Sequence, residues 1–313
     1  MKTVHGMKRD GVRSTGLGLL AAVLAWGLAG CETLNQVAEL GTSIAVETGA
    51  MTPEQKESAD RTTRAVTKTF EDITPEQEYY IGRTVAATVL MGYPPLDADA
   101  LNGYVNRVGQ SLAQFSTRPE TFGGYRFLML DSDDINAFAA PGGLILVTRG
   151  LLRCCETEDE LAAVLAHEIG HVENADGLRA IKTGRLGSAL TVLAVEAGKN
   201  LGGQQLAEVT QAFDESINDI STTLMNSGYS RRLEFQADAS AVKILRKAGY
   251  PPGALVAMLE NMQKNWDASR LDFAATHPPP SDRMAQLRRR GVAATKQTSP
   301  ARQQRFAAAT RGL

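Results

Sequence analysis

Cysteine and histidine are scarce in this sequence, and their scarcity limits the chemistry that the chain can support. The 313 residues include three cysteines and four histidines. Two of the cysteines, Cys154 and Cys155, are adjacent. Neighbouring Cα atoms lie about 3.8 Å apart, which is shorter than the usual span of a disulfide. We therefore expect two small, half-buried residues here rather than a disulfide, a redox pair or a metal site.

A strong net charge is also absent. The formal net charge is −2 at pH 7, and no stretch resembles a nucleic-acid-binding module, so we expect no nucleic-acid partner. The charge is uneven, because residues 281–313 carry Arg and Lys with only one acid, Asp282. We expect residues 291–313 to be a basic, disordered tail.

The N-terminus has an apolar run, residues 17–28, that is too short to span a bilayer as a lasting helix. Basic residues precede it, and it ends in Leu28-Ala29-Gly30-Cys31, which resembles the lipobox of bacterial lipoproteins. The resemblance implies that residues 1–30 are a lipoprotein signal peptide and that Cys31 is lipidated. Glu32 favours the outer membrane, with the protein facing the periplasm. An ordinary signal peptide or an uncleaved anchor is the alternative.

The stretch from Thr157 to Asp176 has the features of a buried helix. Thr157 and Glu160 have the spacing of a capping box, in which each side chain accepts a hydrogen bond from the other's backbone N–H. Apolar residues then recur at helical spacing, at Leu161, Val164, Leu165 and Ile169. This helix contains the sequence HEIGH, from His167 to His171.

Two histidines four residues apart on a helix project about 40° from each other, so both imidazoles reach one ion. His167 and His171 therefore provide two of the three protein ligands of a catalytic zinc, whose fourth position is left for water. Glu168 lies where a carboxylate takes a proton from that water. With four histidines in the whole chain, this pattern is improbable by chance.

The third ligand is not given by the helix itself. The extended pattern HExxHxxGxxH is absent, because Asn174 and Gly177 occupy the Gly and His positions, and this excludes a metzincin. His277 and a carboxylate from another helix remain as candidates. Glu234 is the best placed carboxylate, and Asp238, one turn later, could accept the free ring N–H of a ligand histidine.

Outside the HEIGH helix, the pattern of apolar residues predicts an α+β protein that is mostly helical. Three short apolar runs, broken by turn residues, indicate a small sheet that precedes the HEIGH helix: 125–130, 135–139 and 144–147. Helical patterns occur at 75–91, 99–115 and 230–247. Residues 31–73 are polar and poor in large apolar side chains, so we expect a tether with some helix.

The ordered motifs of this chain resemble those of the zinc gluzincin peptidases related to the CAAX prenyl protease and the HtpX heat-shock protease, in particular their periplasmic lipoprotein members. The resemblance covers about residues 74–290, which would form the metallopeptidase domain with a zincin-like fold. It rests on these segments in order: Asn136-Ala137-Phe138-Ala139, Pro141-Gly142-Gly143, HEIGH, Arg232 to Asp238, and Thr276-His277-Pro278-Pro279 with Arg283.

The resemblance implies a role for each motif residue. His167, His171 and Glu234 would bind one zinc ion, and Glu168 would be the general base. Asp238 would orient a ligand histidine or donate a proton. His277 would be a reversible fourth ligand or would stabilise the oxyanion. The segment with Asn136, Gly142, Gly143 and Leu144 would pair with substrate.

Two features depart from the family. Ala175 and Asp176 replace a basic pair, and only a short tail stands where the best-known periplasmic members have a tetratricopeptide array. The resemblance implies a zinc endopeptidase that hydrolyses unfolded or misassembled cell-envelope proteins, with outer-membrane β-barrels as the main substrates. One alternative is a chaperone-like outer-membrane assembly factor whose zinc site is plugged by His277. The other is a structural zinc domain without chemistry.

Overall fold

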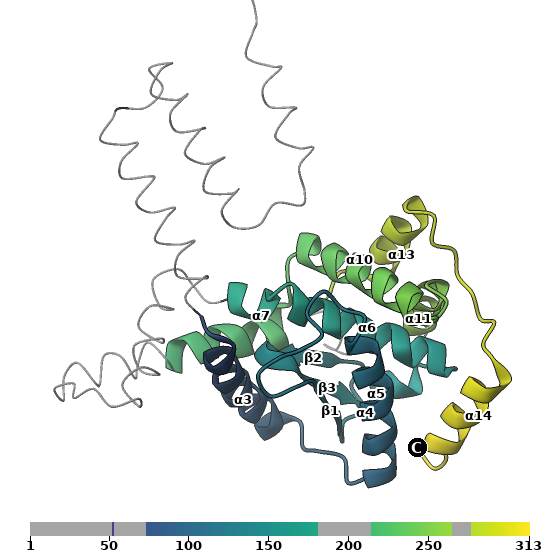
Figure 1. The fold of residues 1–313 in the computed structure, drawn as a ribbon, viewed down its shortest axis with the longest axis horizontal. Helices are drawn as coiled ribbons and strands as arrows, with labels where there is room; N and C mark the ends of the chain where they lie inside the picture. The colour runs from purple at the N-terminus through teal and green to yellow at the C-terminus, as the bar shows by residue number, and fades with distance from the viewer. Residues whose placement is uncertain (1–51, 53–72, 181–213, 265–276) are drawn as a thin grey trace, which may run out of the picture. The chain divides into compact units, whose positions relative to one another are not determined.

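The computed structural model describes these parts of the chain: residue 52 and residues 73–180, 214–264 and 277–313. The chain divides into two compact units, Met1–Asp72 and Ile73–Leu313, and the second holds nearly all of the described residues (Figure 1). The expected signal peptide, Cys31 and nearly all of the expected tether lie outside the described residues.

The described elements of the second unit are mostly helices, with three short strands. In chain order they are α3 (Pro75–Gly92), α4 (Asp99–Ala113), β1 (Arg126–Leu130), β2 (Ala137–Ala140), the 3₁₀ turn η2 (Pro141–Gly143), β3 (Leu144–Thr148), α5 (Arg149–Arg153), α6 (Glu158–Glu173), α7 (Asp176–Arg179), the π-helix η3 (Thr223–Ser227), α10 (Arg231–Lys247), α11 (Gly253–Lys264), α13 (Pro280–Arg289) and α14 (Pro300–Ala309). The expected mostly helical α+β fold is confirmed. None of the helices described has the length and apolar content to span a membrane.

The three strands form a mixed sheet in the order β1-β3-β2. The central strand β3 runs parallel to β1 and antiparallel to β2, so Ile145 lies between Phe127 and Ala139. Both edges of β3 are therefore used. No other strand of the described residues pairs with the outer edge of β2.

The two faces of the sheet pack on different helices, because successive side chains of a strand point to opposite faces. Phe138 and Leu146 pack in one apolar core with the buried residues of α3, such as Val85. Ile145 and Val147 pack in the other core, which contains the apolar residues of α4 and α6. The sheet thus lies between α3 and the helix that carries HEIGH (Figure 1).

Helix α6 is enclosed by its neighbours along nearly its whole length. Every residue from Glu158 to Val172 is buried. Helix α10 approaches it most closely at Gly170, where an added Cβ would lie 2.9 Å from the carbonyl oxygen of Ala237. Because a glycine allows this approach, the first turn of α10 with Glu234 reaches the histidines of α6.

The start of α6 confirms one half of the expected capping box. The Thr157 hydroxyl accepts a hydrogen bond from the Glu160 backbone N–H at 3.2 Å. The reciprocal half was wrong, because the Glu160 carboxylate accepts instead from the backbone N–H of Glu156 and from the side chain of Asn261 on α11. Partners from outside the helix compete successfully for this carboxylate.

The two cysteines after α5 are buried and form no disulfide, as expected. Burial raises the pKa of the Cys155 thiol, so this residue stays neutral. Cys154 and Cys155 belong to the main apolar core, where they pack as small apolar residues.

The C-terminal residues form a helix, so the prediction that residues 291–313 are disordered was wrong. Ser299 caps helix α14, because its hydroxyl accepts a hydrogen bond from the backbone N–H of Arg302 at 3.2 Å. Phe306 is buried in the core that also contains α6. The prediction used only the basic composition of the tail, and it did not include contacts between the tail and other segments of the chain.

The partners of α14 are buried carboxylates at the start of α6. Arg305 donates to both carboxylate oxygens of Glu158, at 3.0 and 2.6 Å. Arg302 donates to Asp159 at 3.2 Å. Both acids are almost completely buried. The positive charge of the tail therefore compensates negative charge on the helix that carries HEIGH.

Candidate metal centre

Two imidazole rings of α6 converge on one point. The Nε2 atoms of His167 and His171 lie 3.2 Å apart, and both side chains are buried. Two ligands that each lie about 2.0–2.1 Å from a tetrahedral ion are separated by about 3.3–3.4 Å. The spacing of four residues on a helix therefore places the two rings as a metal site requires.

A carboxylate of α10 completes a set of three donors. The two oxygens of Glu234 lie 3.5 Å from the Nε2 atoms of His167 and His171. Burial alone would raise the pKa of Glu234, but the surrounding histidines hold it well below its usual value, so the group is ionised. Its Oε1 atom is buried without a hydrogen-bond partner in the described structure. A cation between the three side chains would satisfy that atom, so the residues fit a metal.

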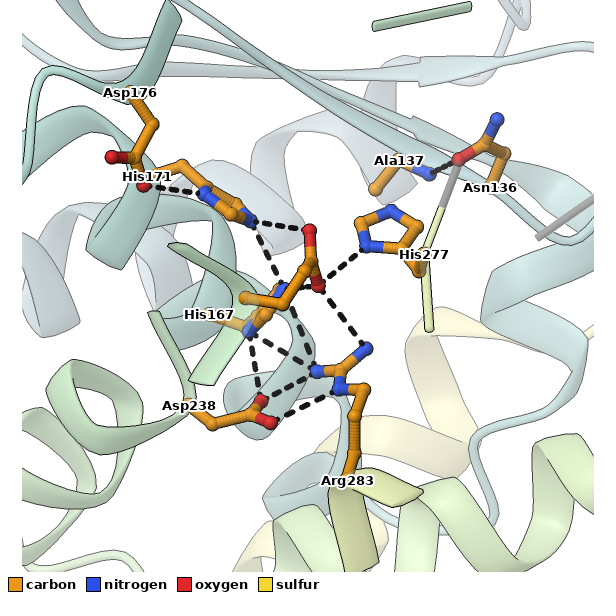
Figure 2. Close-up of polar contacts among 9 residues, drawn as sticks. Asn136, Ala137, His167, His171, Asp176, Asp238, His277 and Arg283 are labelled. Atoms are coloured by element: carbon orange, nitrogen blue, oxygen red, sulfur yellow. Dashed lines mark hydrogen bonds and ion pairs between the residues drawn. The ribbon is translucent and has the colours of Figure 1, made fainter. Parts of the chain in front are cut away.

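His277 joins the same cluster. Its Nδ1 lies 2.8 Å from Oε2 of Glu234, and donor atoms of the four side chains lie within 4.8 Å of one another. Figure 2 shows the imidazoles of His167, His171 and His277 turned toward one centre. Burial is the largest effect on His277 and lowers its pKa, which favours the neutral imidazole that binds metals.

Asp176 fixes the orientation of one histidine. Its Oδ2 lies 2.9 Å from Nδ1 of His171, and the side chain is completely buried (Figure 2). A carboxylate on Nδ1 holds the ring with Nε2 toward the metal position. No pattern in the sequence predicted this partner. The signal was an acid five residues after His171, at the position where the family has a basic pair.

Asp238 and Arg283 hold the other histidine. Asp238 lies 3.0 Å from Nδ1 of His167, as the sequence predicted for a partner of a ligand ring. Arg283 donates to both oxygens of Asp238, at 3.1 and 2.6 Å. Burial would raise the pKa of Asp238, but Arg283 and His167 lower it to about 2. Because Arg283 holds both oxygens of Asp238 and one of them contacts His167, the geometry favours an orienting role for Asp238 over proton donation.

Glu168 follows the first histidine and is only 4% exposed. No other described residue forms a hydrogen bond or an ion pair with its carboxylate, whereas Asp176, Glu234 and Asp238 all have such partners. A buried carboxylate without a partner is costly, and such groups cluster at sites of chemistry. Among these four acids, Glu168 is therefore the one whose carboxylate is not held by another described side chain.

Comparison with known proteins identifies the family. The sequence pattern of peptidase family M48 matches residues 99–291. The chain belongs to peptidase family M48. This confirms the resemblance to the gluzincin peptidases. M48 metalloproteases depend on a metal ion, and the cluster of two histidines and a glutamate agrees with that dependence.

Several curated M48 proteins are similar to this chain. The Beta-barrel assembly-enhancing protease of Escherichia coli (strain K12) is 28% identical over 269 residues, which cover 82% of this chain and 52% of that protein. Metalloprotease LoiP of the same organism is 29% identical over 157 residues, covering 50% and 59%. Mitochondrial metalloendopeptidase OMA1 of Schizosaccharomyces pombe is 32% identical over 158 residues, covering 49% and 42%. The chain thus spans about half the length of the curated relatives that it matches.

The M48 segment with the expected substrate-pairing residues lies on and beside β2. Asn136 precedes β2 and is buried, and its Oδ1 accepts from the Ala137 N–H at 2.9 Å. Gly142 and Gly143 form the turn after β2, with φ of 76° and 96°, which favours glycine.

Leu144 starts the central strand β3, whose two edges are both paired. β1 is the other edge strand, but Phe127 and Met129 donate their backbone N–H groups to the side chains of Asn106 and Asn102. Among the described residues, β2 is therefore the edge strand whose outer side is left for a further strand, and its four residues are buried.

Replacing Asp176 by Asn is expected to weaken metal binding by about 10- to 100-fold. The substitution removes the negative charge of the carboxylate that contacts Nδ1 of His171, and this lowers the basicity of the His171 ring. The change keeps the size of the side chain. The measurement is a competitive zinc titration of the full chain against a chromophoric chelator. An unchanged zinc affinity in this variant would show that Asp176 serves only the packing of α7.

Proposed function

We propose that this M48 protein is a zinc-dependent endopeptidase, with zinc held by His167, His171 and Glu234. The observation that supports this most directly is the donor set itself. Two Nε2 atoms and a carboxylate converge, and one carboxylate oxygen is buried without a hydrogen bond. Three protein ligands of the types N, N and O are typical of catalytic rather than structural zinc sites.

Glu168 is proposed as the general base. When bound, zinc would polarise the scissile carbonyl and lower the pKa of water at the site to about 7. The Glu168 carboxylate takes the proton from the attacking water and then passes it to the leaving amine nitrogen. Asp176 orients His171, and Asp238 with Arg283 orients His167. Asp238 thus acts through His167, and its charge stays constant.

The free edge of β2 is proposed to pair with the backbone of an extended substrate. Helix α6 packs against β2, so a chain on this edge runs past the metal position. Asn136 holds the start of the strand, and Gly142 and Gly143 allow the tight turn at its end. Leu144 supports the edge from the central strand.

The natural substrates are proposed to be unfolded or misassembled cell-envelope proteins, including β-barrels. The name of the Escherichia coli relative, Beta-barrel assembly-enhancing protease, supports this substrate class. The lipobox-like sequence before Cys31 supports attachment by a lipid. Attachment to the outer membrane, with the protein facing the periplasm, is proposed because Glu32 follows Cys31.

Removing the metal is expected to stop cleavage of casein, a loosely folded protein, by the full chain. Adding about one equivalent of zinc should restore the activity, because one set of three ligands binds one ion. The measurement is the rate of casein cleavage against added zinc after dialysis with a chelator. Cleavage that persists in the metal-free protein would contradict the proposal.

A latent site is the second candidate function. His277 lies against Glu234 and within reach of the metal position, which favours a histidine that occupies the fourth position. Such a protein would bind unfolded chains as a chaperone-like assembly factor and would cleave them only after His277 withdraws. His277 lies just before α13 (Pro280–Arg289) and belongs to none of the described helices.

Replacing His277 by Ala is expected to raise the rate of casein cleavage several-fold, because the substrate carbonyl no longer competes with the imidazole. The measurement is kcat and KM on casein for the zinc-loaded full chain and the variant. A fall in kcat would contradict the latent site and would assign His277 to stabilising the oxyanion instead.

A further inference from the structure

An exposed aromatic patch lies at the start of α3. It consists of Tyr79, Tyr80 and Phe122. Tyr80 and Phe122 are 47% and 55% exposed, although most large apolar side chains of the described residues are buried. The ring of Tyr79 lies 5.5 Å from each of the other two, measured between centroids. Arg83 donates to the Tyr79 hydroxyl at 2.9 Å and fixes the ring.

The aromatic patch adjoins the turn at the end of β2. An added Cβ on Gly142 would lie 2.9 Å from Cα of Tyr79, so the backbones of η2 and α3 are in direct contact. The Gly142 N–H donates to the carboxylate of Glu78 at 3.0 Å, which ties η2 to the first turn of α3. The patch therefore begins where the free edge of β2 ends.

The same turn also contacts α7, the short helix that carries Asp176. Ring atoms of Pro141 lie 3.0 and 3.2 Å from the Cβ position of Gly177. Gly177 directly follows Asp176, which binds His171. The turn η2 thus contacts α7, which carries Asp176, on one side and the aromatic patch on the other.

We propose that the aromatic patch docks apolar and aromatic side chains of the polypeptide substrate, on one side of the bond that is cleaved. The inference rests on the proposed function, since it uses the same strand edge. The four residues of β2 span about 13 Å, so a longer extended chain continues over η2 onto Tyr80 and Phe122. Folded proteins bury most of their aromatic side chains, and unfolded chains expose them. The patch therefore selects unfolded substrates.

A membrane surface is the other apolar partner to consider. Glu76 and Glu120 lie close to the patch in sequence and are exposed. Two nearby cations are already bonded: Arg83 to Tyr79 and Arg118 to Glu78. Anionic headgroups attract clusters of basic residues, and this surface has none, so its charges fit a polypeptide better than a lipid surface.

The test replaces Tyr80 and Phe122 together by Ser in the full chain. The matched control is Met91→Ser, since Met91 is 81% exposed at the other end of the same helix. Two substrates are compared: casein, and a four-residue fluorogenic peptide that is no longer than β2. For casein we expect KM to rise about 5- to 10-fold with kcat unchanged, in line with the loss of two aromatic contacts. For the peptide, kcat/KM should stay the same, and the control should match the wild type.

An unchanged KM for casein would overturn the inference. So would an equal loss on both substrates, because it would mean that the substitutions disturb the cleavage site itself. If the wild type cleaves neither substrate, the proposed function fails, and binding then tests the patch. In the Glu168→Gln background, labelled casein should bind the patch variant about 5- to 10-fold more weakly by fluorescence anisotropy. Unchanged casein binding, with weaker binding to anionic vesicles, would assign the patch to membranes instead.

Discussion

Replacing Glu168 by Gln is expected to stop proteolysis and to leave metal binding intact. The carboxamide has nearly the same shape, so the buried position stays filled, but it cannot take a proton from water. The expected fall in kcat on casein is about 10²- to 10⁴-fold, which is the usual contribution of a general base. Zinc content should remain at one ion per chain, because Glu168 is not among the four side chains whose donor atoms converge. The measurements are kcat and bound zinc on the same preparation.

The matched control is Glu173→Gln, the same substitution at the end of the same helix. Glu173 accepts hydrogen bonds from the backbone and hydroxyl of Thr117, and a Gln side chain can also accept them. Its kcat should therefore equal that of the wild type. Two results would contradict the role of Glu168: a variant that keeps most of its activity, or a variant that loses zinc together with activity.

The metal centre was predictable from the sequence wherever it depends on one helix. The distance between His167 and His171 follows from the helical repeat alone, and the structure has their Nε2 atoms 3.2 Å apart. The N-cap of α6 at Thr157 was also predictable, because it depends on a local hydrogen bond between Thr157 and Glu160. Glu234 needed more than spacing, because α10 meets α6 only through tertiary packing at Gly170. There the family motifs, and not the helical period, identified the residue.

The residues that orient the ligand histidines were harder to predict from the sequence. Asp176 follows a left-handed residue, Ala175, with φ of 54°, and this break between α6 and α7 turns the carboxylate back onto His171. No periodic pattern encodes such a turn. Arg283 was recognised as part of a motif without a role, since its carboxylate partner is 45 positions away. Contacts between distant segments leave no signal in the spacing of one sequence.

The C-terminal helix α14 also depends on contacts between distant segments, and here they determine whether a whole helix forms. Taken alone, the basic composition of the tail is typical of a solvated end, which is why disorder was expected. Its stability comes from Glu158 and Asp159, whose carboxylates need cations because they are buried. The tail and the first turn of α6 therefore stabilise each other.

Replacing Arg302 and Arg305 together by Ala is expected to lower the free energy of unfolding by about 2–4 kcal/mol. Removing the cations leaves Glu158 and Asp159 buried without charge compensation, and breaking a buried pair in this way usually costs about 3–5 kcal/mol. We expect a somewhat smaller loss, because the Arg305 side chain is 55% exposed and water screens its charge. The hydroxyls of Tyr104 and Tyr250 also continue to donate to Glu158. The measurement is urea unfolding followed by circular dichroism.

The matched control is Arg288→Ala, which removes an arginine that pairs with Glu260 on the protein surface. An exposed pair contributes only about 0–1 kcal/mol, so this variant should unfold almost like the wild type. If the double variant is equally unaffected, α14 does not stabilise α6, and the buried acids must be compensated in another way. If it unfolds early but cleaves casein normally at low temperature, the tail stabilises the fold without shaping the metal centre. Because the histidines lie at the far end of α6 from Glu158, we expect this second outcome.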